Sequence, residues 1–277
     1  MTRTFLFIFF VTGLLSGCWS RPSNRPNVIL IAVEGLGFDA INCVQSVTEG
    51  SREFAGGFDR FCSESIRYTH AFTPSTLTQS ALASILTAQY PSEHGLRHNG
   101  SQYLSEALKT LPEKAVEQGY RTAFFSGGAP IWRKSGIDQG FELFEDNMTI
   151  RYSQLFRPAG QNIELFLKWI DKDVKGEPFF SFFFLPDLQF PDTQTVSNLG
   201  VQRSLSLESQ RDEIDESFDE FIIELKDRKL WDSSIVILVG TNGRISTEED
   251  QPRGLSLKSE NTQVTLMIKP ARNQREE

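Results

Sequence analysis

The chain has few residues of the kinds that bind transition metals. Its 277 residues include three histidines and three cysteines, and their spacing is not that of a zinc site. One cysteine, Cys18, belongs to the amino-terminal segment discussed below. We interpret the other two, Cys43 and Cys62, as buried free thiols, with a disulfide as the alternative in an oxidising compartment.

Linkers and positive charge are also scarce. No stretch rich in Gly, Ser or Pro divides the chain, and no internal repeat is visible, so we expect one large domain. Lys and Arg number 28 against 36 Asp and Glu, which gives a net charge of −8. Such a surface argues against nucleic acid as a general partner, although a locally basic pocket remains compatible with it.

The amino-terminal segment indicates export. Arg3 precedes an apolar run, Phe5–Leu15, which is too short to span a bilayer as a stable helix. The run ends in small residues directly before Cys18, a pattern that resembles the bacterial lipobox. We therefore expect a signal peptide over residues 1–17, a lipid on Cys18 and a tether over residues 18–26. An ordinary signal peptide with a chance cysteine is the alternative.

Lipidation of Cys18 would anchor the protein to a membrane facing the bacterial periplasm. The residues after Cys18 are Trp19 and Ser20, and neither is the aspartate that would resemble an inner-membrane retention signal. The outer membrane is therefore the favoured location. Removal of the signal peptide would delete one positive charge, Arg3, and no acid. The mature chain would then carry 27 basic and 36 acidic residues, a net charge of −9.

Apolar runs alternate with amphipathic stretches through the rest of the chain. The runs predicted as strands are Asn27–Val33, Arg121–Ser126, Phe179–Leu185, Ser234–Val239 and Gln263–Lys269. The stretches predicted as helices are Ser51–Ser65, the segment after Thr78, the segment capped by Thr110, Gln161–Asp171 and Leu207–Lys229. This alternation predicts a three-layer α/β domain over residues 27–270, with helices flanking a mainly parallel sheet, and a polar tail over 271–277.

Several polar residues directly follow predicted strands. Right-handed crossovers would bring the carboxyl ends of parallel strands to one edge of the sheet, where such folds bind ligands. The residues at that edge are Glu34, Asp187, Gln189, Thr241 and Asn242. Thr78, at the start of an apolar helix, would lie beside them. It is interpreted either as a helix N-cap or as a nucleophile placed at the positive end of the helix dipole.

Six motifs, taken in order, resemble the sulfatase family of the alkaline phosphatase superfamily. They are RPNVILIAVEGLGFD (25–39), FTPSTLTQSALASILTAQYPSEHGLRHNG (72–100), GYRTAFFSGG (119–128), GIDQGFELFED (136–146), PFFSFFFLPDLQFP (178–191) and SSIVILVGTNG (233–243). The resemblance runs from about Arg25 to Pro270. It implies metal-assisted ester chemistry, usually with calcium held by two acids from the first strand and an Asp-Asn or Asp-His pair from the late strand.

The resemblance assigns some residues to family positions and shows others to be replaced. Glu34 matches the first acid, but Gly35 stands where the second belongs. Thr78 matches the nucleophile, which is a threonine in the related phosphoethanolamine transferases, and no formylglycine can be made from it. His94 matches the family's His-Gly, in a structural or a catalytic role. The replaced positions are Ser80 and Leu82 for proline and arginine, Gln189 for histidine, and Thr241 for aspartate, while Asn242 matches the asparagine form.

Charge argues against a working metal site. A hard divalent cation prefers six or more oxygens, usually with two or more carboxylates. Glu34 is the one carboxylate that the resemblance places there, and Asn242 and Thr78 would add neutral oxygens. The sequence therefore predicts a degenerate site from which a calcium-like metal is lost.

Two functional hypotheses follow. In the first, an impaired sulfatase-like lipoprotein binds an anionic glycan, lipid or protein, or has a structural role. In the second, Thr78 is the nucleophile of an active phosphoesterase, sulfuric-ester hydrolase or phosphoryl transferase, and Glu34 and Asn242 hold a weak metal that substrate completes. A product without retained function is a third alternative. Family members usually continue into a small C-terminal subdomain, so the resemblance also implies that this chain, ending at Glu277, lacks that part.

Overall fold

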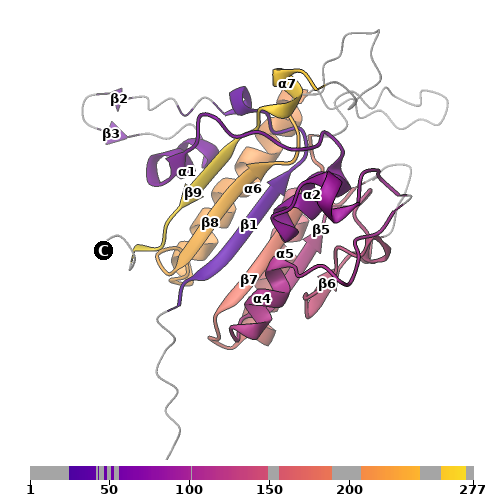
Figure 1. The fold of residues 1–277 in the computed structure, drawn as a ribbon. Helices are drawn as coiled ribbons and strands as arrows, with labels where there is room; N and C mark the ends of the chain where they lie inside the picture. Colours follow the sequence, from indigo (N-terminus) through magenta and orange to yellow (C-terminus); the bar gives the residue numbers. More distant parts are fainter. Residues whose placement is uncertain are drawn as a thin grey trace, which may run out of the picture.

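The central sheet of the molecule contains seven strands in the order β4-β9-β8-β1-β7-β5-β6 (Figure 1). The computed structural model describes residues 25–41, 43, 47–48, 51–52, 56–100, 102–148, 156–188, 207–243 and 257–272. The strands of this sheet are β1 Asn27–Val33, β4 Ile66–Arg67, β5 Arg121–Ser126, β6 Leu143–Glu145, β7 Phe179–Leu185, β8 Ser234–Gly240 and β9 Leu266–Lys269. A separate pair is formed by β2 Val47–Thr48 and β3 Ser51–Arg52.

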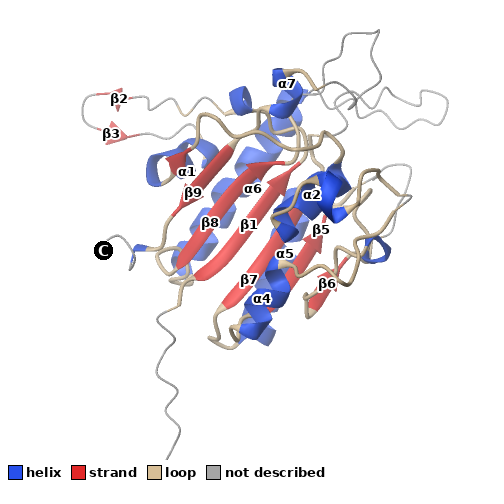
Figure 2. Cartoon of the chain, in the orientation of Figure 1, coloured by secondary structure: helices blue, strands red, loops and turns tan. Residues whose placement is uncertain are grey.

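Helices cover both faces of the sheet, as Figure 2 shows. One face carries α2 (Thr78–Thr87) and α4 (Leu111–Glu117), and the other carries α1 (Gly57–Glu64), α5 (Ala159–Trp169) and α6 (Leu207–Asp227). The shorter elements are α3 Pro91–His94, α7 Ser259–Thr262, the 3₁₀ turns Phe38–Ala40 and Arg133–Ser135, and a π-helical turn, Ile170–Val174. The predicted three-layer α/β architecture is confirmed.

Strand β1 is the centre of a parallel block. It pairs with β7 on one side, where Val33 lies opposite Leu185, and with β8 on the other, where Val33 lies opposite Gly240. Because all three strands point the same way, the residues that follow them emerge together at one edge, here called the carboxyl edge. The opposite edge, where β1 and β8 begin, is called the amino edge.

The last predicted strand is shorter than expected and runs the other way. The sequence predicted Gln263–Lys269, whereas β9 begins at Leu266 and pairs antiparallel with β8, Val236 lying opposite Lys269. The carboxyl end of β9 therefore lies at the amino edge. The chain needs no crossover helix to reach this strand, since antiparallel neighbours require only a short connection.

Phenylalanine rings fill the space on both sides of the sheet. Every residue of β7 is buried, because helices cover the strand on both faces. The odd-numbered Phe183 packs with Phe166 of α5 and Phe221 of α6. The even-numbered Phe182 stacks on Phe124 on the opposite face. The continuous apolar run FFSFFFL thus reflects burial from two sides.

Helix α4 follows the predicted capping pattern. Thr110 is its N-cap, with Oγ1 accepting a hydrogen bond from the Glu113 amide, and the Glu113 carboxylate in turn accepts from the Thr110 amide at 2.7 Å. This reciprocal pair satisfies two helix-end donors. The first predicted helix is less accurate, because Ser51–Arg52 is strand β3 and α1 starts only at Gly57. Asp215 of α6 accepts from the Phe58 amide at 2.6 Å and so fixes that start.

The two cysteines of the domain form a disulfide, so the expectation of free thiols was wrong. Cys43 and Cys62 are bonded, with their Cα atoms 5.6 Å apart. Helix α1 brings Cys62 against the segment that follows the turn at Phe38–Ala40. Met267 of β9 lies beneath the pair, with its sulfur 3.9 Å from Cys43 Sγ and 3.5 Å from Cys62 Sγ.

Several sequence-based predictions fall outside the described residues. These are the signal peptide, Cys18, most of the tether, Gln189 and most of the polar tail. Within the described part of the chain, no helix combines the length and the apolar character needed to cross a membrane.

Candidate functional site: the carboxyl edge around Thr78

A buried carboxyl group and a buried hydroxyl meet where β1 ends and α2 begins. Thr78 Oγ1 donates a hydrogen bond of 2.6 Å to Glu34 Oε1. Thr78 is 1% exposed and Glu34 is 4% exposed. The structure therefore brings together two residues that are 44 positions apart in the sequence, as the resemblance implied. It also encloses the hydroxyl that a substrate would have to reach.

The environment of Glu34 favours its protonated form. Burial raises the pKa of Glu34 from 4.5 to about 7, and the hydrogen bond from Thr78 offsets only part of that rise. Its second oxygen, Oε2, is buried and has no hydrogen-bond partner. Protonation of Glu34 near neutral pH therefore reduces the negative charge of this site.

Thr78 is not the N-cap of its helix. Helix α2 begins at Thr78 itself, the N-cap position is Leu77, and no side chain of that residue caps the helix. The threonine hydroxyl is directed to Glu34 instead. The capping interpretation of Thr78 is therefore wrong in its detail, since the hydroxyl serves a contact between α2 and β1.

Another residue supplies the missing cap. Asn99 Oδ1 accepts a hydrogen bond of 3.1 Å from the Gln79 amide in the first turn of α2. The Gln79 side chain in turn donates to the Pro130 carbonyl at 2.6 Å and accepts from the Gly100 amide at 2.8 Å. A backbone donor that could hold an anionic group is thus already occupied. Sequence reasoning missed Asn99, because its partner lies twenty residues away and no local pattern links them.

Asn242 connects three segments at the same edge. Its Oδ1 accepts from the Gly35 amide at 2.7 Å and from the Thr241 hydroxyl at 3.2 Å, and its Nδ2 donates to the Thr76 carbonyl at 3.3 Å. Asn242 is 3% exposed. Both ends of the amide are therefore used inside the protein, and its oxygen already accepts two hydrogen bonds.

The turn after Glu34 depends on glycine. Gly35 has φ +78°, in the left-handed region that residues with a Cβ seldom adopt. A Cβ placed there would lie 3.3 Å from the carbonyl oxygen of Leu188, in the turn that follows β7. The position at which the family carries its second acid is thus held in a conformation that glycine adopts readily and that aspartate adopts only occasionally.

His94 lies along α2 but does not contact Thr78. Its Nε2 is 3.0 Å from Ser84 Oγ, and its Nδ1 accepts from the Leu96 amide at 3.1 Å. Since Nδ1 is an acceptor, the neutral ring carries its proton on Nε2 and donates it. Burial lowers the pKa of His94, which favours that neutral ring. The geometry gives His94 a structural contact between α2 and the turn after α3.

Asp187 emerges at the same edge but faces a different helix. Its Oδ1 accepts from the Ala159 amide at the start of α5, at 2.8 Å. Burial raises its pKa to about 7, although that hydrogen bond opposes the rise. Among the described contacts, none joins Asp187 to Thr78, and Gln189 lies outside the described residues.

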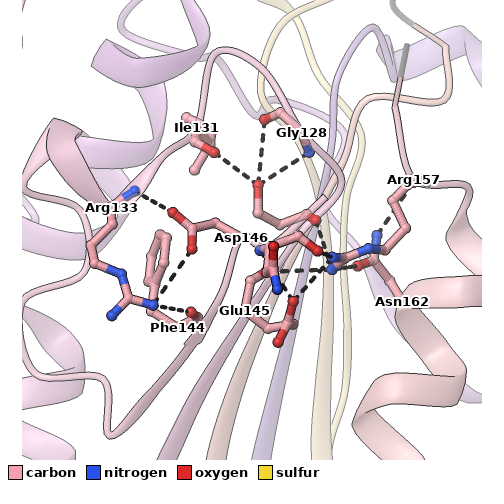
Figure 3. Close-up of polar contacts among 10 residues, drawn as sticks. Gly128, Ile131, Arg133, Phe144, Glu145, Asp146, Arg157 and Asn162 are labelled. Atoms are coloured by element: carbon pink, nitrogen blue, oxygen red, sulfur yellow. Dashed lines mark hydrogen bonds and ion pairs between the residues drawn. The ribbon is translucent and has the colours of Figure 1, made fainter. Parts of the chain in front are cut away.

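A buried arginine fastens the neighbouring part of the edge (Figure 3). Arg157, 5% exposed, donates to the Ser126 carbonyl at 3.2 Å and to Asn162 Oδ1 at 3.3 Å. Its other nitrogen reaches the Glu145 carboxylate at 3.1 Å and the Asn147 carbonyl at 2.7 Å. These bonds from both terminal nitrogens of the guanidinium tie the ends of β5 and β6 to the start of α5.

The described residues at this edge do not fit a hard divalent cation. Glu34 is the one carboxylate bonded within this network, and the Asn242 oxygen already accepts two hydrogen bonds. Calcium usually takes six to eight oxygens, including several carboxylates. Over the part of the chain that the structure describes, no group of three or more His, Cys, Asp or Glu residues is placed to hold a metal ion.

Comparisons with solved structures show the same fold in larger proteins. One is a structure described under glycosaminoglycan metabolism by Bacteroides thetaiotaomicron (TM-score 0.64, 16% identity, 88% of this chain, 67% of that chain). A second is the phosphonate monoester hydrolase of Agrobacterium radiobacter (0.64, 15%, 89%, 68%). A third is the lipoteichoic acid synthase LtaP from Listeria monocytogenes (0.62, 16%, 89%, 66%). The chain spans about two thirds of the length of these structures.

Sequence comparisons give the family. A search of curated proteins found no match. The sequence model of the Sulfatase family matches residues 26–187. This segment contains Glu34, Thr78, His94 and Asp187, and it includes more than half of the chain. On that match, this chain belongs to the sulfatase family.

Proposed function

We propose that this protein is a lipid-anchored member of the sulfatase family in the periplasm, with the outer membrane as its favoured location. Its site is catalytically impaired, and it binds an anionic ligand or partner. The observation that carries the proposal is the closed network at the carboxyl edge. The Thr78 hydroxyl is 1% exposed and bonded to Glu34, and the Asn242 oxygen is bonded to the Gly35 amide.

The physical argument concerns charge and access. The family reaction needs positive charge to stabilise the developing oxyanion, and a metal supplies it when bound. One carboxyl group with a pKa of about 7 supplies little negative charge to hold such an ion. The cap that Asn99 provides also occupies a backbone donor at the start of α2. Both features argue against turnover at this site.

The names of structural neighbours suggest the class of ligand. They include a 2-O GAG sulfatase and a lipoteichoic acid synthase. Each of these names refers to a polymer that carries sulfate or phosphate groups. An anionic glycan or lipid is therefore the proposed ligand of this chain, and a protein presenting such groups is included.

Metal titration tests the impaired site. Isothermal calorimetry of the purified full chain with calcium is expected to show no stoichiometric binding at micromolar concentration. A parallel panel of phosphate and sulfate esters, with calcium, manganese or zinc added, is expected to show no turnover. Tight binding of one calcium per chain would overturn the proposal.

The alternative function is an active phosphoesterase, sulfuric-ester hydrolase or phosphoryl transferase, and the short Thr78–Glu34 hydrogen bond favours it. A nucleophile within hydrogen-bond reach of a base is the arrangement that such chemistry requires. In that reaction, the Thr78 oxygen would bond to phosphorus or sulfur and the ester oxygen would leave with the electrons of the broken bond. Glu34 would take the threonine proton.

Two threonines of one helix separate these functions. Thr78→Ala would abolish any turnover found in the ester panel if Thr78 is the nucleophile. Thr87→Ala is the matched control, because Thr87 lies in the same helix and its hydroxyl makes only local hydrogen bonds, donating to the Ala83 carbonyl and accepting from the Gln89 amide. Turnover that survives in Thr78→Ala would refute this role for the residue.

A further inference from the structure

The chain enters the domain at the amino edge of the sheet. The Asn27 amide donates to the Ser233 carbonyl at 2.9 Å, and the Tyr120 hydroxyl donates to the Pro26 carbonyl at 3.0 Å. The Arg25 side chain also donates to the Gln118 carbonyl. The position at which the tether meets the domain is therefore fixed. Glu34 lies at the far end of β1, about 20 Å away for a strand of this length.

A basic cavity lies next to this junction. Its volume is about 340 Å³, and its lining residues, here called the Trp231 cluster, are Lys226, Lys229, Trp231, Asp232 and Arg272. The cluster lies at the amino edge because Trp231 and Asp232 directly precede β8. Arg272 follows β9, which runs antiparallel, and its amide donates to the Asp232 carbonyl at 2.9 Å.

Positive charge surrounds the indole of Trp231. The Lys226 ammonium lies 5.3 Å from the ring centroid, and the buried Lys269 ammonium lies 4.6 Å from it. Ammonium groups at these distances are attracted to the face of an aromatic ring. Lys269 is 0% exposed and donates to the Trp231 and Ser234 carbonyls, so it lies behind the indole and does not line the cavity.

The acids near the cluster offset only part of this charge. Glu64 accepts from Trp231 Nε1 at 2.9 Å and pairs with Lys226 at 3.1 Å, while Asp232 pairs with Arg272 at 3.1 Å. Burial alone would raise the pKa of Glu64, but these partners lower it overall, so the group remains ionised. Two acids, Glu64 and Asp232, thus face the three basic residues of the cluster. Lys229 is exposed and has no acidic partner among the described residues.

We propose that the Trp231 cluster is a docking surface for the anionic headgroups of membrane phospholipid. It holds the amino edge against the bilayer and turns the Thr78 site away from it. The inference rests on the lipid anchor of the proposed function. From Cys18 to Arg25 the chain can span at most about 25 Å, so an anchored protein keeps this edge near the membrane. Basic residues close to an anionic bilayer are attracted to it, and an exposed lysine fits a phosphate group.

The orientation limits the choice of partner. A ligand of the Thr78 site would have to come from the side facing away from the anchoring membrane, such as a soluble or cell-wall polyanion. A lipid of the same membrane would meet the Trp231 cluster instead. Membrane attachment at the Trp231 cluster and ligand binding at the Thr78 site would thus take place at opposite edges of the sheet.

The test measures headgroup binding without relying on the anchor. The full chain in neutral detergent is titrated with dihexanoyl-phosphatidylglycerol below its micelle concentration, and separately with dihexanoyl-phosphatidylcholine and inorganic phosphate. We expect binding of the phosphatidylglycerol alone, weakening as salt is raised. Equal binding of both lipids, or binding of inorganic phosphate only, would overturn the proposal. Mass spectrometry for a lipid on Cys18 separately tests the anchor.

Three variants localise the binding. Lys229→Glu is expected to weaken phosphatidylglycerol binding at least fivefold, and Asp232→Asn to strengthen it, because an acid that competes for Arg272 is removed. Lys134→Glu is the matched control, since it makes the same charge change at an exposed residue after β5, near the carboxyl edge. An equal loss in Lys134→Glu would attribute binding to net charge and refute the site. Unchanged binding in both cluster variants would refute it as well.

Discussion

The Thr78 hydroxyl donates a hydrogen bond of 2.6 Å to Glu34, and both side chains are buried. Here the two groups bond directly, and Asn242 links the neighbouring turn to β8 and to the segment before α2. The carboxyl edge is thereby closed by hydrogen bonds within the protein.

Glu34 and Asp187 are expected to make the folded protein less stable as pH rises toward 7. Each folded pKa is about 7, raised from 4.5 and 3.8 respectively, so the folded protein keeps protons that the unfolded chain releases. Their contribution is present in full below the unfolded pKa values and is lost as pH rises toward 7. For Glu34 the loss is about 3 kcal/mol at most. Urea unfolding between pH 4 and 8 measures it.

The isosteric variants supply the control. Glu34→Gln and Asp187→Asn keep an oxygen that accepts from Thr78 and from the Ala159 amide, but they do not titrate. Each variant is expected to show a smaller fall in the free energy of unfolding as pH rises, and the double variant is expected to show the smallest fall. A wild-type protein that becomes more stable between pH 5 and 7, relative to the double variant, would contradict the raised pKa values.

Restoring the family acid at Gly35 is expected to destabilise the protein. Gly35→Asp places a Cβ at φ +78° and 3.3 Å from the Leu188 carbonyl, at a cost of about 1–2 kcal/mol. Gly35→Ala is the steric control and should lose a similar amount. Unfolding of each variant in urea, with and without calcium, gives the comparison. If calcium stabilised Gly35→Asp beyond wild type, the site would be competent for metal after one substitution.

Removing the distant cap is expected to weaken the start of α2. Asn99→Ala leaves the Gln79 amide without its acceptor and should cost about 1 kcal/mol. Asn99→Asp keeps a side-chain oxygen and should retain most of the stability. Thermal unfolding and hydrogen exchange at Gln79 measure the effect. Equal stability of Asn99→Ala and wild type would show that the cap contributes nothing.

Loss of the disulfide is expected to lower stability by about 3 kcal/mol, because a bond across nineteen positions restricts the unfolded chain. Reduction with dithiothreitol should lower the melting temperature of wild type. The double variant Cys43→Ala/Cys62→Ala should melt at a lower temperature and be insensitive to the reductant. A melting temperature of wild type that does not respond to complete reduction would contradict the expected contribution.

Local patterns made much of the fold predictable. The run NVILIAV and the run FFSFFFL have the composition of strands buried on both faces, and β1 and β7 have the predicted bounds. Thr110, predicted as a helix cap, likewise marks the start of α4. The start of α1 was less predictable, because it is fixed by Asp215, a residue more than 150 positions away.

The sequence predicted which residues lie at the candidate site better than it predicted the hydrogen bonds that they make. Glu34, Thr78, Thr241 and Asn242 meet at the carboxyl edge, as the strand order and the resemblance implied. The cap from Asn99, the contact of His94 with Ser84 and the separate position of Asp187 were not visible in the sequence. These depend on how loops fold back over α2 and α5.

The sequence by itself determined the family, the alternation of strands and helices, and the loss of acids at Gly35 and Thr241, because these are properties of residue type and order. The tertiary structure decided how the remaining groups bond. Burial raised the pKa values of Glu34 and Asp187, and the approach of α1 to the segment after β1 joined Cys43 to Cys62. It also directed the Thr78 hydroxyl to a carboxyl group, since a contact between residues 44 positions apart exists only after the sheet and α2 have packed.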